Sequence, residues 1–229
     1  DLPDDFDEHV NRILDTLPSR INEYEAILTD NPIWRHRTMG VGVISKDDVI
    51  RSGLTGPLLR ASGVKHDLRQ ARPYSSYDKF DFEIPTSDMC DCYGRYLVRV
   101  AEMRQSLRIM RQALDGMPEG RYRALAPGVV LPTKYETTHS MEALIFHFKL
   151  ITEGFHPPVG EVYQTIEAPK GELGFYIVSD GSPQPLRMRV RPPSFVNISA
   201  LSKLVMGQLI ADVIACIGSV DIVLGEVDR

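Results

Sequence analysis

Apolar residues at helical spacing predict two long helices. The first follows Asp4 and Asp5, which suit a helix N-terminus, and continues to Leu28 with an apolar residue every three or four positions. Pro18 is expected to kink or divide it. The second is the strongest helix in the sequence and extends over Asp88–Leu114. Its predicted apolar stripe consists of Leu97, Val100, Met103, Leu107, Met110 and Leu114. The charged residues expected to cover its remaining surface are Arg95, Arg99, Glu102, Arg104, Arg108 and Arg111.

Shorter helices are expected on either side of the second long one. Ser45–Asp48 resembles a capping box that opens a short helix ending at Gly53. Residues 54–86 are rich in Gly, Pro, Ser and Arg without a clear period, which predicts a long structured loop, a feature that tends to be functional. A further helix is predicted from about Ser140 to Thr152, after a loop. A final apolar helix is predicted from a Ser199 cap to about Ile217.

Alternating residues predict strands in the intervening part of the chain. The expected strands are Glu161–Ala168, Gly174–Ser179 and Leu186–Arg191. The turn signal Ser179–Ser182 should join the last two strands as a hairpin. The predicted class is therefore α+β: a bundle of long helices with a small antiparallel β-sheet near the C-terminal end.

Charge, hydropathy and cysteine content argue against several classes of protein function. A net charge of −5 argues against a nucleic-acid binder. Residues 1–30 carry nine carboxylates against two arginines, whereas residues 51–72 have a net charge of +4, which indicates either complementary protein surfaces or a solvated charged face. The apolar run near Leu204–Ile217 is interrupted by polar residues, so it predicts a core helix and no membrane span. Cys90 and Cys92 lack a second ligand pair, and Cys216 is expected in the core, so no bound metal is predicted.

Two charged residues in the last quarter of the chain stand at apolar boundaries. Lys170 lies between Pro169 and Gly171, on a bend between two predicted strands. A cation fixed there could stabilise an anionic partner or pair with a buried carboxylate, and the alternative is an exposed turn lysine. Asp221 interrupts an apolar run, so its carboxylate must be paired, hydrogen-bonded or facing a cavity. The six histidines show no recognisable nucleophile signature.

Several stretches in order along the chain carry a family resemblance. They are Thr55–Val64, Asp67–Arg69 with Pro73–Tyr77, Glu102–Ser106, Glu167–Gly171, Ser179–Gly181 and Gly225–Arg229. Together they resemble the C-terminal part of the 49-kDa subunit of respiratory complex I, which in bacteria is the D subunit of NADH-quinone oxidoreductase. That family is similar in turn to the large subunit of nickel–iron hydrogenases.

The resemblance implies a hydrogenase-like helical bundle that has lost its metal site. Hydrogenase large subunits carry a comparable Glu-Ala-Pro-Arg-Gly segment and a C-terminal Cys-x-x-Cys, whereas this chain has Lys170 and no terminal thiol pair. In the complex I family the vacated cavity accepts a quinone headgroup. Matched by position, Asp221 would set polarity and proton supply there, and Val223 would contact the ring. Lys170 and Arg229 are weaker candidates as ions left from the ancestral site.

The implied function is that of a peripheral-arm subunit of a proton-translocating NADH:quinone oxidoreductase. Quinone is the expected substrate, NAD is used elsewhere in the complex, and the electrons would come from a tetranuclear iron–sulfur cluster (4Fe-4S) on the small iron–sulfur subunit. The 30-kDa subunit is the other expected partner, on the cytoplasmic side of a bacterial inner membrane or the matrix side in mitochondria. Alternatives are a relative with a ferredoxin or deazaflavin donor, or a non-catalytic half-subunit.

The resemblance also implies that residues 1–229 form the C-terminal part of a single hydrogenase-like domain. The family's quinone-headgroup histidine and tyrosine belong to an N-terminal half that would precede Asp1. The isolated chain is therefore expected to have no quinone reductase activity and to bind no cofactor of its own.

Overall fold

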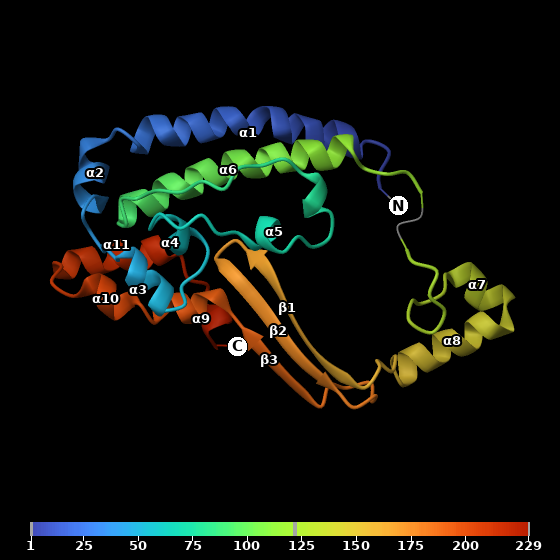
Figure 1. The fold of residues 1–229 in the computed structure, drawn as a ribbon. Coiled ribbons are helices and arrows are strands. Elements are labelled where there is room, and N and C mark those ends of the chain that lie inside the picture. Colours follow the sequence, from blue (N-terminus) through green and yellow to red (C-terminus); the bar gives the residue numbers. More distant parts are fainter. Residues whose placement is uncertain (1, 121–122, 229) are drawn as a thin grey trace. The chain divides into compact units, whose positions relative to one another are not determined.

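The structure is a computed structural model that describes residues 2–120 and 123–228. Arg229, one of the weaker site candidates, lies outside the described residues. The chain divides into two compact units (Figure 1). The larger unit comprises Leu2–Met117, Thr165–Gly174 and Val190–Arg229, and the smaller comprises Pro118–Gln164 and Phe175–Arg189.

In the larger unit, helices α1 (Phe6–Leu28) and α6 (Cys92–Asp115) lie side by side and antiparallel (Figure 1). Helix α1 continues through Pro18, so the expected division is wrong. The missing N–H removes one backbone hydrogen bond, but contacts with α6 on both sides of the proline keep the helix intact. Leu14 and Ile21 are buried, and Arg111 donates to Asp15 at 2.8 Å.

Helix α6 does not have the single apolar stripe that its sequence predicts. Met103 and Met110 are exposed, whereas Val98 and Ile109 are buried. Arg95, expected on the outer surface, is fully buried at 0% exposure. The reason is that α6 has neighbours on several sides: it contacts α1, α2 (Pro32–Thr38), α4 (Pro57–Arg60) and α11 (Ile210–Val220). Arg95 is tolerated inside because hydroxyl, carbonyl and sulfur acceptors surround its guanidinium.

The segment between Leu54 and Ile84 forms the structured loop expected from its composition. It contains the short helices α4 (Pro57–Arg60), α5 (Leu68–Ala71) and the 3₁₀ turn η1 (Tyr77–Lys79). It is preceded by α2 (Pro32–Thr38), capped by Asn31, and α3 (Lys46–Arg51), capped by the Ser45 hydroxyl as predicted. The short helices bury apolar residues and Arg60 in the core.

A three-stranded antiparallel sheet has the order β1 (Gly160–Ala168), β2 (Gly171–Ser179), β3 (Arg187–Arg191). Consecutive strands pair, so the sheet is a meander, and the predicted class of α+β is confirmed. Strand β2 begins three residues earlier than predicted because Pro169 and Lys170 form a two-residue turn. Gly171 follows this turn at φ 133°.

The expected single C-terminal helix is wrong. The structure has α9 (Pro193–Ile198), α10 (Leu201–Val205), α11 (Ile210–Val220) and α12 (Leu224–Asp228). Gly207 adopts φ 74°, which ends the α10 turn, and Asp212 then accepts the Leu209 N–H at 3.2 Å as α11 begins. Backbone breaks of this kind leave the apolar periodicity intact, so the sequence pattern predicts one helix.

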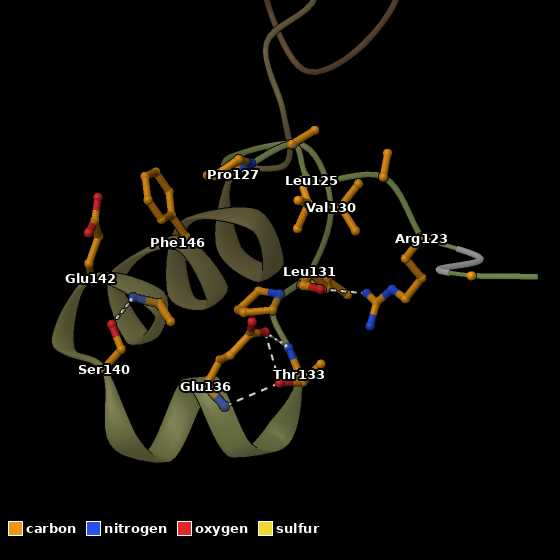
Figure 2. A pocket seen from close by; sticks show the side chains of 15 residues that line it. Arg123, Leu125, Pro127, Val130, Leu131, Thr133, Glu136, Ser140, Glu142 and Phe146 are labelled. Atoms are coloured by element: carbon orange, nitrogen blue, oxygen red, sulfur yellow. Dashed lines mark hydrogen bonds between the residues drawn. The ribbon is translucent and has the colours of Figure 1, made fainter. Parts of the chain in front are cut away.

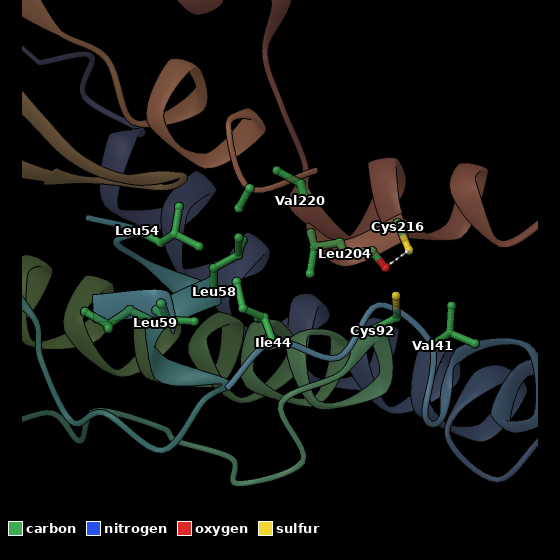
Figure 3. Close-up of a cluster of buried hydrophobic side chains, with 11 residues drawn as sticks. Val41, Ile44, Leu54, Leu58, Leu59, Cys92, Leu204, Cys216 and Val220 are labelled. Carbon is green, nitrogen blue, oxygen red and sulfur yellow. Dashed lines mark hydrogen bonds between the residues drawn. The ribbon is translucent and has the colours of Figure 1, made fainter. Parts of the chain in front are cut away.

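The core of the larger unit joins these segments (Figure 3). Its buried members come from α3 and the segments on either side of it, from α4, from the start of α6, and from α11 and α10 with the residue before α10. They are Val41, Ile44, Val49, Leu54, Leu58, Leu59, Cys92, Ala200, Leu204, Cys216 and Val220. Burying these side chains contributes about 1.5–3 kcal/mol for each large aliphatic residue, so α10 and α11 are held on the α4–α6 side by apolar contact.

The smaller unit contains α7 (Lys134–His139) and α8 (Met141–Thr152). Helix α8 was predicted, but α7 was expected to be loop; its signal is the capping box of Thr133 and Glu136. These helices and the segment before them line a cavity of about 630 Å³, which Phe146 and Leu131 border (Figure 2). Among the described residues, no helix is long and apolar enough to cross a membrane.

Gly56 should be the least replaceable glycine of the larger unit. Its φ of 71° and ψ of −146° form a conformation that is essentially restricted to glycine. A Cβ there would lie 2.6 Å from the Gly171 Cα and 2.7 Å from the Lys170 carbonyl oxygen. Gly56→Ala should lower the free energy of unfolding by about 3 kcal/mol or more, measured by urea denaturation.

The control is Gly53→Ala. Gly53 also has a positive φ, 66°, but nothing lies within 4 Å of the position that its Cβ would occupy. The expected loss is about 1–2 kcal/mol, from the backbone conformation alone. Equal losses for the two variants would contradict the importance of the close contact at Gly56.

Candidate functional site

The turn that carries Lys170 is fixed by contacts with α9 and with the residue before α4. The Asn197 side chain is fully buried and donates Nδ2–H to the Lys170 carbonyl at 3.0 Å. On the other side, the Glu172 N–H donates to Thr55 Oγ1 at 3.0 Å. Because both ends of the turn are anchored, the Lys170 side chain extends from a defined backbone position.

Lys170 and Asp221 are brought together, as an ion pair between Nζ and Oδ2. Asp221 is the residue after α11 and adopts the left-handed conformation, with φ 57° and ψ 53°. Its N–H still donates to the Ile217 carbonyl at 3.2 Å, which ends the helix and turns the carboxylate toward the cations. The Asp221 side chain is 42% exposed, so the expected carboxylate partner of Lys170 exists but is only half-buried.

Arg99 is a second cation at Asp221, and sequence reasoning missed it. The Arg99 Nε lies 3.7 Å from Asp221 Oδ2, and its Nη2 donates to the Ser219 carbonyl at 2.8 Å. Burial lowers the pKa of Arg99, and the nearby Asp221 charge opposes that effect. The sequence placed Arg99 on an exposed face because the contact of α6 with α11 is not encoded in the local pattern.

A cavity of about 540 Å³ lies beside this cluster. The residues lining it come from α2, α6 and α11 and from Asp221 itself. They are Trp34, Arg37, Thr38, Cys92, Tyr96, Arg99, Ile214, Ala215, Gly218, Ser219 and Asp221. Its walls therefore combine aromatic rings with a carboxylate and two guanidinium groups, a composition suited to an aromatic ligand with polar substituents.

Val223 lies two residues beyond Asp221 but is not among the residues that line this cavity. Its side chain is 43% exposed, and its N–H donates to Ser194 Oγ at 3.2 Å. The Ser194 hydroxyl in turn donates to Glu226 Oε2 of α12 at 2.5 Å. These bonds fix the backbone of Val223 and leave its side chain available for apolar contact.

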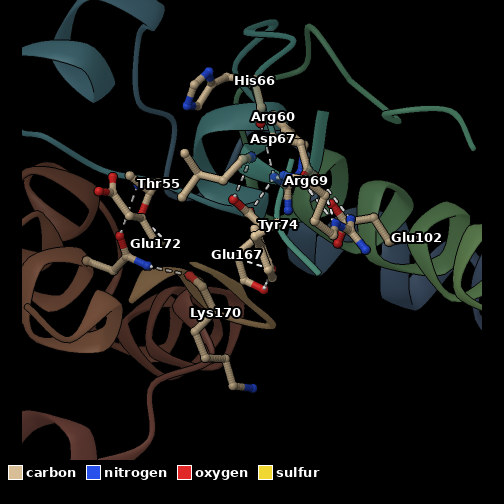
Figure 4. A network of polar contacts seen from close by, with 12 residues as sticks. Thr55, Arg60, His66, Asp67, Arg69, Tyr74, Glu102, Glu167, Lys170 and Glu172 are labelled. Carbon is tan, nitrogen blue, oxygen red and sulfur yellow. Dashed lines mark hydrogen bonds and ion pairs between the residues drawn. The ribbon is translucent and has the colours of Figure 1, made fainter. Parts of the chain in front are cut away.

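A buried ion network lies behind the turn (Figure 4). Arg60, 3% exposed in its side chain, donates to Glu102 at 2.5 Å and to Glu167 at 2.7 Å, and its Nη1 lies 3.7 Å from Asp67. Asp67 also pairs with Arg69. Glu167 additionally accepts the Leu68 N–H at 3.2 Å. The network ties the end of β1 to α4, α5 and α6, three residues before Lys170.

The pKa values of two carboxylic acids in this network, Glu102 and Asp67, are shifted in opposite directions. Burial raises the pKa of Glu102, and the charge and hydrogen bond of Arg60 only partly oppose it. Burial also acts to raise the pKa of Asp67, but the hydrogen bond and charge of Arg69 outweigh it, so that pKa is lowered. The fold therefore favours ionised Asp67 and disfavours ionised Glu102.

Comparison with known proteins identifies the family to which the chain belongs. The chain belongs to the family described as respiratory-chain NADH dehydrogenase, 49 Kd subunit, whose sequence model matches residues 1–229. This confirms the family resemblance found in the sequence.

Three relatives, all D subunits of NADH-quinone oxidoreductases, show the extent of the similarity. The chain is 58% identical to D subunit 1 of Solibacter usitatus over 227 residues, 99% of this chain and 56% of that protein. It is 54% identical to the D subunit of Geotalea uraniireducens over 229 residues, all of this chain and 59% of that protein. It is 52% identical to D subunit 2 of Chloroflexus aurantiacus, covering 56% of that protein. The chain thus spans a little over half the length of these curated relatives.

Removing a carboxylate from the network should be costly because it leaves a buried guanidinium underpaired. Glu167→Gln is expected to lower the free energy of unfolding by about 3 kcal/mol or more. The exposed pair of Asp15 and Arg111 provides the control, and Asp15→Asn should cost less than about 1 kcal/mol. Urea denaturation of the three proteins measures both values, and similar losses would contradict a special role for the network.

The two directions of pKa shift predict opposite pH dependences. Ionised Asp67 stabilises the fold above its unfolded pKa of about 3.9, and this contribution is lost as the pH falls through its lower folded pKa. The cost of Asp67→Asn should therefore be largest near neutral pH and shrink below about pH 4. Glu102 is protonated more readily when folded, so the cost of Glu102→Gln should decrease as the pH rises above about 4.3. Urea denaturation at a series of pH values measures both costs. If the two costs changed with pH in the same direction, the opposite pKa shifts of Asp67 and Glu102 would be contradicted.

Proposed function

We propose that this chain is the quinone-site part of a peripheral-arm subunit of a proton-translocating NADH:quinone oxidoreductase. The observation that carries the proposal is the position of Asp221, a carboxylate at a cavity wall between the cations Lys170 and Arg99. Family membership and the names of the relatives, which are NADH-quinone oxidoreductase D subunits, support the reaction.

Asp221 is proposed to set the polarity at the quinone headgroup and to participate in proton supply. Lys170 and Arg99 both pair with its carboxylate, and 42% of the side chain stays exposed, so the carboxylate is fixed in position and still accessible to a ligand. Quinone reduction consumes two electrons and two protons, and the ring carries the redox chemistry. The chain's own task is to orient the ring and to hold charge and protons near its oxygens.

Val223 and Lys170 have different proposed roles in this site. Val223 supplies an exposed apolar side chain on a backbone fixed by Ser194, which suits contact with the ring. Lys170 acts through Asp221, because its ammonium group is engaged with that carboxylate. This proposed role as a structural cation agrees with the expected match of Lys170 to the hydrogenase arginine.

The wider assignment follows from the same proposal. The chain would form the C-terminal part of a hydrogenase-large-subunit-like domain. Its neighbours would be the small iron–sulfur subunit, which would hold the terminal iron–sulfur cluster, and the 30-kDa subunit. The complex would lie on the cytoplasmic face of a bacterial inner membrane, or the matrix face in mitochondria. The relatives' greater length supports a second part of the subunit that completes the site.

Variants of Asp221 and Val223 test the assignment in the intact complex. Asp221→Asn should lower turnover by about a hundredfold, the lower end of the range expected for loss of a proton-transfer group. Val223→Met should raise the apparent KM for quinone and change inhibitor sensitivity, because it enlarges the side chain against the ring. Asp47→Asn on α3, an exposed carboxylate away from the cavity, is the control. Unchanged turnover, KM and inhibitor sensitivity in both site variants would refute the proposed site.

The purified 229-residue chain should show no quinone reductase activity with NADH as donor. The electron-transfer centres are proposed to belong to other subunits, so the chain alone has no route from donor to quinone. Spectroscopic assay of NADH oxidation with a soluble quinone analogue measures this, with the intact complex as the positive control. Measurable turnover by the isolated chain would place the electron donors within it and refute the proposal that the electron-transfer centres belong to other subunits.

A further inference from the structure

Two thiols and a guanidinium meet at a buried point between α6 and α11. Cys92 is 3% exposed, and Cys216 and Arg95 are each 0% exposed. Figure 3 shows the two sulfur atoms pointing toward one another, Cys92 from the first turn of α6 and Cys216 from α11. Cys92 also lines the 540 Å³ cavity beside Asp221, but none of the three residues is one of the proposed quinone contacts Asp221, Val223 and Lys170.

Gly42 defines how closely these groups approach. The position that a Cβ would occupy on Gly42 lies 2.8 Å from the Cys216 sulfur, 3.3 Å from the Cys92 sulfur and 3.0 Å from Arg95 Nη2. Both sulfurs and the guanidinium therefore surround one point, and they occupy the space that a side chain on Gly42 would need. Burial, and then the Cys92 thiol beside it, raise the pKa of Cys216 to about 11.

Arg95 is paired with neutral groups and with sulfur. Its Nη2 donates to the Gly42 carbonyl at 2.9 Å and to the Cys92 sulfur at 3.2 Å, and its Nε donates to the Ser219 hydroxyl at 3.0 Å. Within residues 2–120 and 123–228, no carboxylate forms an ion pair with Arg95. The guanidinium therefore donates directly to the sulfur of Cys92, and the deprotonated form of a thiol is the one that attacks disulfides.

Access to this site is provided from one side. Cys92 is among the residues that line the 540 Å³ cavity, whereas Cys216 is not. A small molecule entering the cavity would meet the Cys92 sulfur first, with Cys216 behind it. This order makes Cys92 the attacking thiol and Cys216 the resolving thiol.

We propose that Cys92 and Cys216 are a redox-active dithiol that reacts with low-molecular-weight disulfides. The Cys92 thiolate attacks one sulfur of the small disulfide, forms a mixed disulfide and releases one small thiolate. Cys216 then attacks the Cys92 sulfur, forms the Cys92–Cys216 bond and releases the second small thiolate. The two thiol protons pass to the released thiolates, so the protein loses two electrons and the small disulfide gains them.

The bond would couple the redox state of the dithiol to the neighbouring cavity. It would link the start of α6 to α11, five residues before Asp221 at the end of that helix. Oxidation should therefore restrain α11 against α6 and raise the melting temperature of the protein.

The third thiol, Cys90, makes a selective test possible. Cys90 is partly exposed and its thiol donates to the Asp88 carbonyl at 3.4 Å, away from the pair. A Cys90→Ser chain retains only the two buried thiols. It is incubated folded with 2-hydroxyethyl disulfide, quenched in acid, alkylated in denaturant, digested and analysed by mass spectrometry.

The expected result is loss of both free thiols and a peptide pair joined through Cys92 and Cys216. In the same background, Cys216→Ala should stop at a hydroxyethyl adduct on Cys92, and Cys92→Ala should leave Cys216 unmodified. Two thiols that stay free, or separate adducts on both cysteines without the joined peptides, would overturn the proposal. Because the readout is chemical, it is independent of whether the quinone site is correct.

Arg95 is a positioning residue in this scheme, and its contribution is measured by the rate of Cys92 modification. Arg95→Gln should slow that reaction by about tenfold or more at neutral pH, while a higher pH restores it. An unchanged rate and pH profile would remove Arg95 from the scheme. Arg95→Lys, which retains the charge, is the matched control and should react faster than Arg95→Gln.

Discussion

The arrangement of the larger unit depends on one buried guanidinium. Arg60 on α4 contacts carboxylates from three other segments: Asp67 before α5, Glu102 on α6 and Glu167 at the end of β1. Each charge would be costly to bury alone, so the position of every segment depends on the others. Lys170 follows Glu167 by three residues, so the ion pair of Glu167 with Arg60 also restrains the turn that carries Lys170.

Close backbone contact completes the placement of the turn. Gly56 and Gly171 approach so closely that a side chain on either would meet the other's backbone. The Thr55 hydroxyl and the buried Asn197 amide then satisfy polar backbone groups at both ends of the turn. Packing, hydrogen bonds and the ion network all hold the turn in one position, and from that position Lys170 reaches Asp221.

Helix α6 presents charge to the interior along one side. Arg95, Arg99 and Glu102 recur at four- and three-residue intervals and face three different partners: the thiol pair, Asp221 and Arg60. Such a row is tolerated in the interior because neighbouring segments supply acceptors and counter-charges. One helix thus connects the proposed dithiol, the proposed quinone site and the ion network that positions the turn.

The sequence alone determined the family, the α+β class, the long helices and the strands, because periodicity and motifs such as Glu167–Gly171 are local. It also indicated that Asp221 had to be paired, hydrogen-bonded or facing a cavity, and it left Lys170 as either a paired cation or an exposed turn residue. Only the tertiary structure decided that they partner each other, that Arg99 joins them and that Arg95 is buried. Those outcomes depend on contacts between segments far apart in the sequence, and the helical pattern of α6 cannot show which of its faces meets α11.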